Sequence, residues 1–293
     1  MKIKDLINSY LSYIQNIKRY SLQTVKAYRT DLTQFSEYFK TTNKNDTGQL
    51  TERTIKMFLM HLSETGIDKS SISRKLASVR GMLKFAFQNK IIGSNPAAYI
   101  INPKSSKKLP EVTTTESILK IYQIADEADE NPELVKIIFE MLYGCALRVS
   151  ELCDLNFGDL DINSRTVRVM GKGSKLRIIP VGEKSIEIIK QYLSKINHQQ
   201  NNDPLILTKG GNRLYPRLVY RIINKYLSKV TDIKKKSPHV LRHSAATHML
   251  DNGADLVAVK EILGHENLST TQIYTHVSIE RLKSTYKKSH PKS

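Results

Sequence analysis

Apolar residues in the first part of the chain recur every three or four positions, which is the period of an amphipathic helix. The pattern predicts helices over residues 3–14, from Ser21 to the region of Phe39, over residues 51–63 and over residues 71–89. The side chains expected on the apolar faces are Ile3, Leu6, Ile7, Tyr10, Leu11, Ile14, Val25, Tyr28, Leu32, Phe35, Phe39, Leu76, Val79, Leu83 and Phe87. We therefore predict a bundle of four helices over residues 1–103.

A stretch rich in proline and small polar residues follows this bundle. Residues 93–110 contain three prolines and a short basic run, a composition typical of a linker. We therefore expect a helical domain at residues 1–103, a linker at 104–112 and a second domain at 113–293.

The second domain is expected to combine helices with one hairpin. Residues 166–170 and 176–181 are rich in β-branched and apolar side chains and flank a glycine-containing turn, which predicts two antiparallel strands. A sheet of two strands is only marginally stable by itself, so a third short strand is expected near residues 155–160. Helices are predicted after a capping box at Thr113–Glu116, from Pro132 to Gly144, after Arg148, over residues 184–196, 216–230, 240–250 and 255–263, and after a second capping box at residues 269–272. The fold class is therefore mainly α, with a small antiparallel sheet in the second domain.

The charge of the chain indicates what kind of partner the protein binds. The net charge is +18, in a sequence with the 40% hydrophobic and 25% charged residues of a globular protein. Such an excess indicates a polyanionic partner, and no apolar run is long enough to cross a membrane. The charged N-terminus does not resemble a secretory signal, so we expect a cytoplasmic protein that binds nucleic acid.

Basic residues are concentrated in the first domain, which carries 16 basic and 7 acidic residues, a charge of +9. Arg74, Lys75 and Arg80 lie off the apolar face of the fourth predicted helix and are candidate DNA-binding residues. For any one of them, solvation of a helix surface is the favoured interpretation. The excess over the whole bundle is therefore the evidence for DNA binding.

The two cysteines and the carboxylates do not indicate a metal site. Cys145 and Cys153 lack a second pair of ligands at zinc spacing, and we expect reduced, buried thiols. The carboxylates do not cluster at a spacing that suits a divalent metal. We therefore expect neither a metal nor a cofactor.

Six side chains that could act on a phosphate lie near predicted helix ends or at the hairpin turn: Arg148, Lys172, His239, Arg242, His265 and Tyr274. Two guanidiniums can bind the non-bridging oxygens of a phosphodiester and neutralise charge in its transition state. A tyrosine can attack phosphorus if an imidazole accepts its proton, and a lysine on a mobile turn can protonate the leaving oxygen. The set is suited to metal-free phosphoryl transfer.

Simpler interpretations of these residues remain open. Arg148 could pair with Glu151 three residues later, and His265 could bind the carbonyls at a helix end. A helix-turn-helix at residues 239–263 could read DNA without chemistry. Lys175 is a rival of Lys172 for the role of acid, and Lys172 is preferred because it lies between Gly171 and Gly173.

The segments ALRVSEL, HVLRHSAATHML, LGH and TTQIYTHV resemble the signature boxes of the tyrosine recombinases, most closely those of the Xer-type recombinases of bacterial chromosomes. SLQTVKAYRTDL resembles the start of the family's core-binding domain, so the resemblance covers nearly the whole chain. It implies a four-helix SAM-like core-binding bundle followed by an α+β catalytic domain whose C-terminal tail packs on a neighbouring protomer.

The resemblance also implies a role for each residue of the site. Arg148 and Arg242 would hold the scissile phosphate, and Tyr274 would be the nucleophile. Lys172 would be the acid to the 5′ oxygen, while His239 and His265 would assist. If Tyr274 were not the nucleophile, Tyr286 would be the next candidate.

The implied reaction cuts and rejoins double-stranded DNA at a specific site, through a 3′-phosphotyrosyl intermediate and a four-way junction. The implied assembly is a homotetramer on two DNA sites, or a heterotetramer with a related recombinase. Recombinases of this family are often regulated by a septal DNA translocase, which is therefore an expected partner. Resolution of chromosome dimers is the expected role. A mobile-element or integron integrase of the same family and a type IB topoisomerase are the alternatives.

Overall fold

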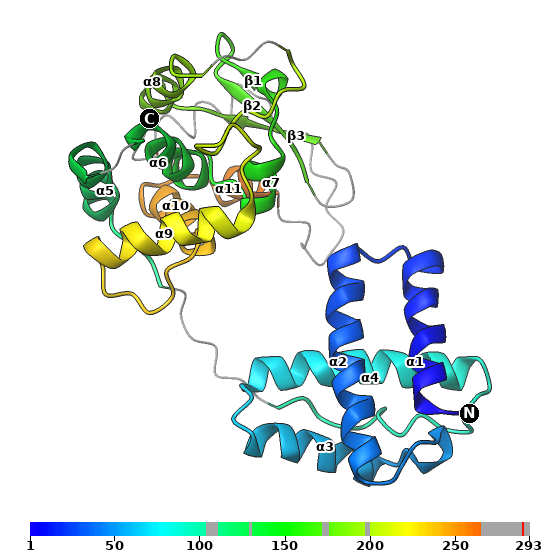
Figure 1. Ribbon diagram of the computed structural model, residues 1–293. Helices are drawn as coiled ribbons and strands as arrows, with labels where there is room; N and C mark the ends of the chain where they lie inside the picture. The colour runs from blue at the N-terminus through cyan, green and yellow to red at the C-terminus, as the bar shows by residue number, and fades with distance from the viewer. Residues whose placement is uncertain (104–110, 129–130, 172–175, 197–199, 265–288, 290–293) are drawn as a thin grey trace. The chain divides into compact units, whose positions relative to one another are not determined.

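The computed structural model describes residues 1–103, 111–128, 131–171, 176–196, 200–264 and 289. Lys172, Lys175, His265, Tyr274, Tyr286 and the second predicted capping box therefore lie outside the described residues. The chain divides into two compact units, residues 1–108 and 109–293. Figure 1 shows the elements of each unit.

The N-terminal unit is a helical bundle, as the apolar pattern predicts. Its α-helices are α1 (Ile3–Ser12), α2 (Leu22–Thr41), α3 (Glu52–Glu64) and α4 (Lys69–Gln88), with a π-helical turn η1 (Tyr13–Ile17) after α1 and a 3-10 turn η2 (Thr47–Gln49) before α3. The side chains of Ser21, Thr51 and Asp68 accept hydrogen bonds from the first turns of α2, α3 and α4, which fixes where each helix begins. Figure 1 shows α4 crossing both α1 and α2, and it packs against each of them.

Two details of the predicted bundle are wrong, and both concern α4. The apolar face continues through Ala86, which is fully buried, and Phe87 is 49% exposed because it lies beyond that face. Lys75, expected on the solvated surface, is buried. Its burial is possible because its ammonium contacts the buried carboxylate of Asp31.

The C-terminal unit places helices around a small sheet, as predicted. The α-helices are α5 (Thr115–Ala128), α6 (Pro132–Phe139), α7 (Val149–Asp154), α8 (Glu183–Leu193), α9 (Pro216–Val230), α10 (Pro238–Asp251) and α11 (Leu256–Leu263). The side chain that accepts a hydrogen bond at the start of α5 belongs to Thr114, so the predicted cap at Thr113 is wrong by one residue.

The sheet has three antiparallel strands in the order β1-β2-β3, namely β1 (Leu160–Asp161), β2 (Thr166–Met170) and β3 (Leu176–Pro180), and a 3-10 turn η4 (Phe157–Asp159) leads into β1. Val167 pairs with Ile179, and Val169 pairs with Arg177. The third strand exists, but it is shorter and later than the predicted region at residues 155–160.

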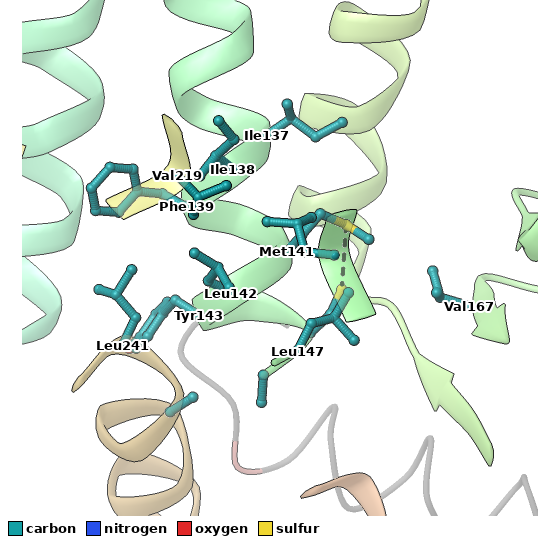
Figure 2. Close-up of a cluster of buried hydrophobic side chains, with 14 of the residues drawn as sticks. Ile137, Ile138, Phe139, Met141, Leu142, Tyr143, Leu147, Val167, Val219 and Leu241 are labelled. Atoms are coloured by element: carbon teal, nitrogen blue, oxygen red, sulfur yellow. Dashed lines mark hydrogen bonds between the residues drawn. The ribbon is translucent and has the colours of Figure 1, made fainter. Parts of the chain in front are cut away.

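The core of this unit surrounds α6 and the π-helical turn η3 (Glu140–Gly144) that continues it. Figure 2 shows Ile137, Phe139, Leu142 and Tyr143 of this segment among apolar side chains from several elements, including Val219 of α9, Leu241 of α10 and Val167 of β2. A helix that is apolar all round belongs in the centre of a core. The segment therefore fixes the position of the residues that follow it, Cys145 to Arg148.

The π-helical character of η3 is visible in its backbone hydrogen bonds. The N–H of Cys145 donates to the carbonyl of Glu140, five residues back, at 3.0 Å. Glycine suits position 144, because a Cβ atom there would lie 2.1 Å from Oε1 of the buried Glu140, which would have to move. Beyond the turn, Ala146 has a φ of +51°, in the left-handed region, and directs the chain into α7.

Both cysteines are free thiols buried in this core, as predicted. Burial raises the pKa of each thiol, that of Cys153 to about 12. In the parts of the chain that are described, no group of three or more potential ligands could hold a metal ion. None of the described helices is both long enough and apolar enough to cross a membrane.

Candidate active site

Three of the six predicted site residues lie in the described part of the chain. Arg148 is the residue before α7, at the end of the buried α6–η3 segment, and its side chain is 31% exposed. Arg242 lies in α10 with a buried side chain, and His239 lies in the first turn of the same helix and is exposed. The structure brings Arg148 and Arg242 together, although 94 residues (242 − 148) separate them in the sequence.

The two arginines meet at the carboxylate of Glu151, whose side chain is only 4% exposed. Nη1 of Arg148 donates to Oε1 of Glu151 at 2.6 Å, and the backbone N–H of Arg148 donates to Oε2 at 2.8 Å. Nη1 of Arg242 lies 3.8 Å from Oε2. The pairing of Arg148 with Glu151, considered from the sequence as an alternative to a phosphate site, is therefore one part of a larger cluster.

A third guanidinium completes the cluster. Arg177 of β3 donates from Nη1 and Nη2 to the two carboxylate oxygens of Glu151, each at 2.8 Å. Burial raises the pKa of Glu151. The hydrogen bonds from Arg177 and from the backbone of Arg148 outweigh this effect and lower the pKa to about 2. Glu151 is therefore ionised at neutral pH.

The same three arginines bind the C-terminal end of α11. Nε of Arg177 donates to the carbonyl of Ile262 at 3.1 Å, Arg242 donates to the carbonyl of Leu263, and Nη2 of Arg148 donates to the carbonyl of Gly264 at 2.9 Å. The last carbonyls of a helix lack partners within the helix and carry partial negative charge, so cations stabilise them. Gly264 ends α11 with a φ of +60°, as its predicted role at the helix end requires.

The electrostatics of the cluster favour an added anion. Three guanidiniums and one carboxylate give a formal charge of 3 − 1 = +2. Burial lowers the pKa of Arg242 to about 9, and the neighbouring Arg148 and Arg177 act in the same direction while Glu151 opposes them. A monoanionic phosphodiester next to Arg148 and Arg242 would relieve this repulsion.

Two members of the cluster were missed as site residues. The sequence predicts Glu151 only as a partner of Arg148, and its patterns assign no role to Arg177. The signal for Arg177 was a charged residue two positions from Ile179, on the inward face of an apolar strand. Burial of a charge at such a position requires a partner of opposite charge.

A row of basic residues on α9 was also missed. Arg217, Arg221, Lys225 and Lys229 recur at every fourth position, so they follow one side of the helix, and all are exposed. The first three line a surface depression of about 690 Å³ together with Tyr220, Lys236 and neighbouring residues. The signal in the sequence was the recurrence of a basic residue at every fourth position of a predicted amphipathic helix.

The predicted DNA-binding residues of the N-terminal unit all have partners inside the unit. Arg74, at 47% side-chain exposure, pairs with the buried Asp31, and Lys75 contacts Asp31 and the side-chain oxygen of Gln34 at 3.2 and 2.6 Å. Arg80 donates to backbone carbonyls at residues 97 and 100, which ties the segment after α4 to the helix. DNA binding by these three residues stays a prediction, and each also has a structural role.

Comparison with known proteins identifies the family. The model for the phage integrase family matches residues 111–281, and the model for the phage integrase N-terminal SAM-like domain matches residues 7–90. The chain belongs to the phage integrase family. It is a tyrosine recombinase.

Alignments with similar tyrosine recombinases cover nearly the whole chain. Tyrosine recombinase XerC of Chlorobaculum parvum is 35% identical and is aligned over 97% of this chain and 94% of its own length. Tyrosine recombinase XerD of Staphylococcus epidermidis is also 35% identical, over 99% of this chain and 100% of its own length. These relatives support the predicted Xer-type resemblance, and the family catalyses DNA strand exchange with a tyrosine nucleophile.

Solved structures of tyrosine recombinases share the fold. The Tn1549 transposon integrase in complex with circular intermediate DNA has 20% identity and a TM-score of 0.71, and the match covers 97% of this chain and 98% of that one. A lambda integrase dimer bound to a COC′ core site has 18% identity and a TM-score of 0.72, with 94% and 100% covered. The mainly helical recombinase fold, with a SAM-like N-terminal domain and a small sheet in the catalytic domain, is confirmed.

Proposed function

We propose that this protein resolves chromosome dimers by site-specific recombination in the cytoplasm of a bacterium. Support comes from the XerC and XerD relatives, which match over nearly the entire chain. The observation that carries the chemistry is the meeting of Arg148 and Arg242 at the end of α11, directly before the sequence that contains His265 and Tyr274.

In the proposed reaction, Arg148 and Arg242 bind the two non-bridging oxygens of the scissile phosphate. Their positive charge stabilises the five-coordinate transition state, which carries more negative charge on these oxygens. The phenol oxygen of Tyr274 attacks phosphorus while His239 and His265 assist proton transfer. The bond to the 5′ oxygen breaks, and Lys172 protonates that oxygen.

The products of this step are a 3′-phosphotyrosyl linkage and a free 5′ hydroxyl. The 5′ hydroxyl of a second strand then attacks the phosphotyrosine and releases Tyr274, so no external energy source is needed. Two such exchanges would form a four-way junction, and two more would resolve it.

The proposed substrate is double-stranded DNA with a specific recombination site. The row of basic residues on α9 supports this, because it presents four exposed cations along one side of the helix to a polyanion. The +9 charge of the N-terminal domain supports a second contact with the duplex. We place this domain at residues 1–103, a linker at 104–112 and the catalytic domain at 113–293.

The proposed assembly is a tetramer on two DNA sites, with identical protomers or with a related recombinase as the second component. The tail beyond Tyr274 would pack on a neighbouring protomer. A septal DNA translocase is the proposed regulator.

The chemistry is tested with a nicked suicide substrate. Duplexes bound by the protein are first selected from a randomised pool, and a nick is placed so that cleavage releases a short fragment that carries the free 5′ hydroxyl. Wild-type protein should form a covalent adduct that survives denaturing electrophoresis, and Tyr274→Phe should form none. An adduct that persists in Tyr274→Phe would show that another tyrosine is the nucleophile, and Tyr286 would be tested next.

The acid is tested by changing the leaving group. Lys172→Ala should cleave slowly on ordinary DNA and recover on a substrate with a 5′-bridging sulfur, because a thiolate leaves without a proton. Lys175→Ala is the matched control and should cleave ordinary DNA normally. The reverse pattern would assign the acid to Lys175.

The biological role is tested with a plasmid that carries two copies of the selected site. Resolution into two circles supports site-specific recombination, whereas relaxation of supercoils alone would indicate a topoisomerase. Inactivation of the gene in its host should cause dimeric chromosomes to accumulate. Excision or insertion of a mobile element at the site would instead indicate an integrase.

A further inference from the structure

The feature that the proposed reaction leaves unexplained is Arg177. Its side chain is 13% exposed, and its three nitrogens all have partners within the protein. Among the described residues, two guanidinium nitrogens of Arg148 and two of Arg242 donate hydrogen bonds to the protein, whereas Arg177 donates from all three. This difference indicates that Arg177 acts through other residues rather than through contact with the substrate.

The geometry of Glu151 shows what Arg177 does to it. Both carboxylate oxygens accept hydrogen bonds from Arg177, in the parallel two-bond arrangement that fixes the plane of a carboxylate. In this orientation Glu151 offers one oxygen to the side chain of Arg148 and the other to its backbone N–H. Without Arg177, the carboxylate could rotate and bind the Arg148 guanidinium with both oxygens, in competition with a phosphate.

Arg177 also packs against the C-terminal end of α11. Its Nε bonds the carbonyl of Ile262, and Cδ, Nε and Nη1 would each lie 3.1 Å from a Cβ atom at residue 264. Glycine at this position therefore permits the close approach of Arg177 to the helix end. The same side chain therefore links β3 to the end of α11, which directly precedes the sequence that contains His265 and Tyr274.

We propose that Arg177 is a positioning residue for phosphoryl transfer: it fixes the carboxylate of Glu151 and the end of α11 so that Arg148 and Arg242 present free donors to the scissile phosphate. This inference rests on the proposed function. Lysine cannot replace arginine fully, because a single ammonium cannot bond both carboxylate oxygens and the carbonyl of Ile262 in the same geometry.

The first test measures cleavage of the selected, nicked duplex. At saturating DNA, Arg177→Ala should form the covalent adduct about 10- to 100-fold more slowly than wild type, with little change in Kd, because a supporting contact is lost and the DNA contacts are kept. Arg177→Lys should recover part of the rate. Arg168→Ala, on the neighbouring strand β2 with an exposed side chain, is the matched control and should cleave at the wild-type rate.

A double-mutant cycle separates positioning from a loss of stability. If Arg177 acts through Glu151, Arg177→Ala should reduce the cleavage rate by a much smaller factor in a Glu151→Gln background than in wild type. Equal costs in both backgrounds would overturn the proposal. So would an Arg177→Ala rate within about twofold of wild type in protein whose melting temperature is lowered, since that result assigns Arg177 to stability alone.

A second readout does not depend on recombination. Phenylglyoxal modifies accessible arginines, and inorganic phosphate bound at the site should protect Arg148 from it, as measured by mass spectrometry. Protection should be seen in wild type and Arg168→Ala and be lost in Arg177→Ala. If wild type forms no covalent adduct, the proposed function fails while this protection still tests Arg177; protection that persists in Arg177→Ala would overturn the positioning role.

Discussion

Lys75 offers a sharp test of whether the basic residues of the N-terminal unit stabilise the fold or bind DNA. The ammonium of Lys75 contacts Asp31, which is fully buried, and Gln34, and the lysine side chain is 9% exposed. The change Lys75→Ala removes the buried partner of that carboxylate and leaves Arg74, which is 47% exposed, as its remaining cation.

The expected loss is large for a single residue. Removal of one partner of a buried ion pair costs about 3–5 kcal/mol, and the lower end applies because Arg74 remains near the carboxylate. For a unit of this size, about 3 kcal/mol corresponds to a fall in melting temperature on the order of 12 °C or more. Lys84→Ala removes an exposed cation from the same helix and should change stability by no more than about 0.5 kcal/mol.

The assay combines calorimetric melting with DNA binding at several salt concentrations. A residue that contacts a phosphate contributes about 0.9 to the slope of log Kd against log salt concentration. Lys75→Ala, measured below its melting transition, should keep the wild-type slope. An unchanged melting temperature together with a slope reduced by about one would refute the structural role and make Lys75 a phosphate contact.

Further predictions follow from the catalytic unit. Arg221→Ala should weaken DNA binding and reduce the salt slope by about one without lowering the melting temperature, as measured by fluorescence anisotropy and calorimetry; an unchanged slope would remove α9 from the DNA interface. The folded-state pKa of Glu151 is lowered from 4.5 to about 2, so its ionised form contributes stability that is full above about pH 4.5 and is lost as the pH falls towards 2; the stability of Glu151→Gln, followed by urea denaturation, should depend less on pH in this window, and an equal dependence would contradict the lowered pKa. Cys145 and Cys153 should react with a maleimide only after denaturation, since burial raises both thiol pKa values, and rapid labelling of the native protein would contradict this.

The elements of the fold were predictable wherever one face of a helix is apolar. The limits of α9 agree with the prediction, because Pro216 begins the helix and its buried positions Val219, Ile223, Tyr226 and Leu227 follow the helical period. The hairpin was equally clear from its β-branched strands. The place of the third strand was not, because β1 contains only Leu160 and Asp161, and so short a strand carries no period.

The candidate site was predictable in part. Arg148 and Arg242 were identified through the chemistry of a phosphate and through family resemblance, and the structure brings them together. Glu151 and Arg177 could not be assigned in the same way, because their roles depend on a contact between β3 and α7 that no local pattern encodes. The burial of Lys75 was missed for the same reason: its partner Asp31 lies on another helix.

The π-helical turn at residues 140–144 makes the length of this segment as important as its composition. Its backbone hydrogen bond spans five residues instead of the four of an α-helix, and each residue of an α-helix turns the chain by about 100°. Deletion of one residue here could leave a regular buried helix, but Arg148 would then start from a different rotational position and point away from Glu151. The direction of the Arg148 guanidinium is thus set by the number of residues in this buried turn, and a single insertion or deletion there should change it.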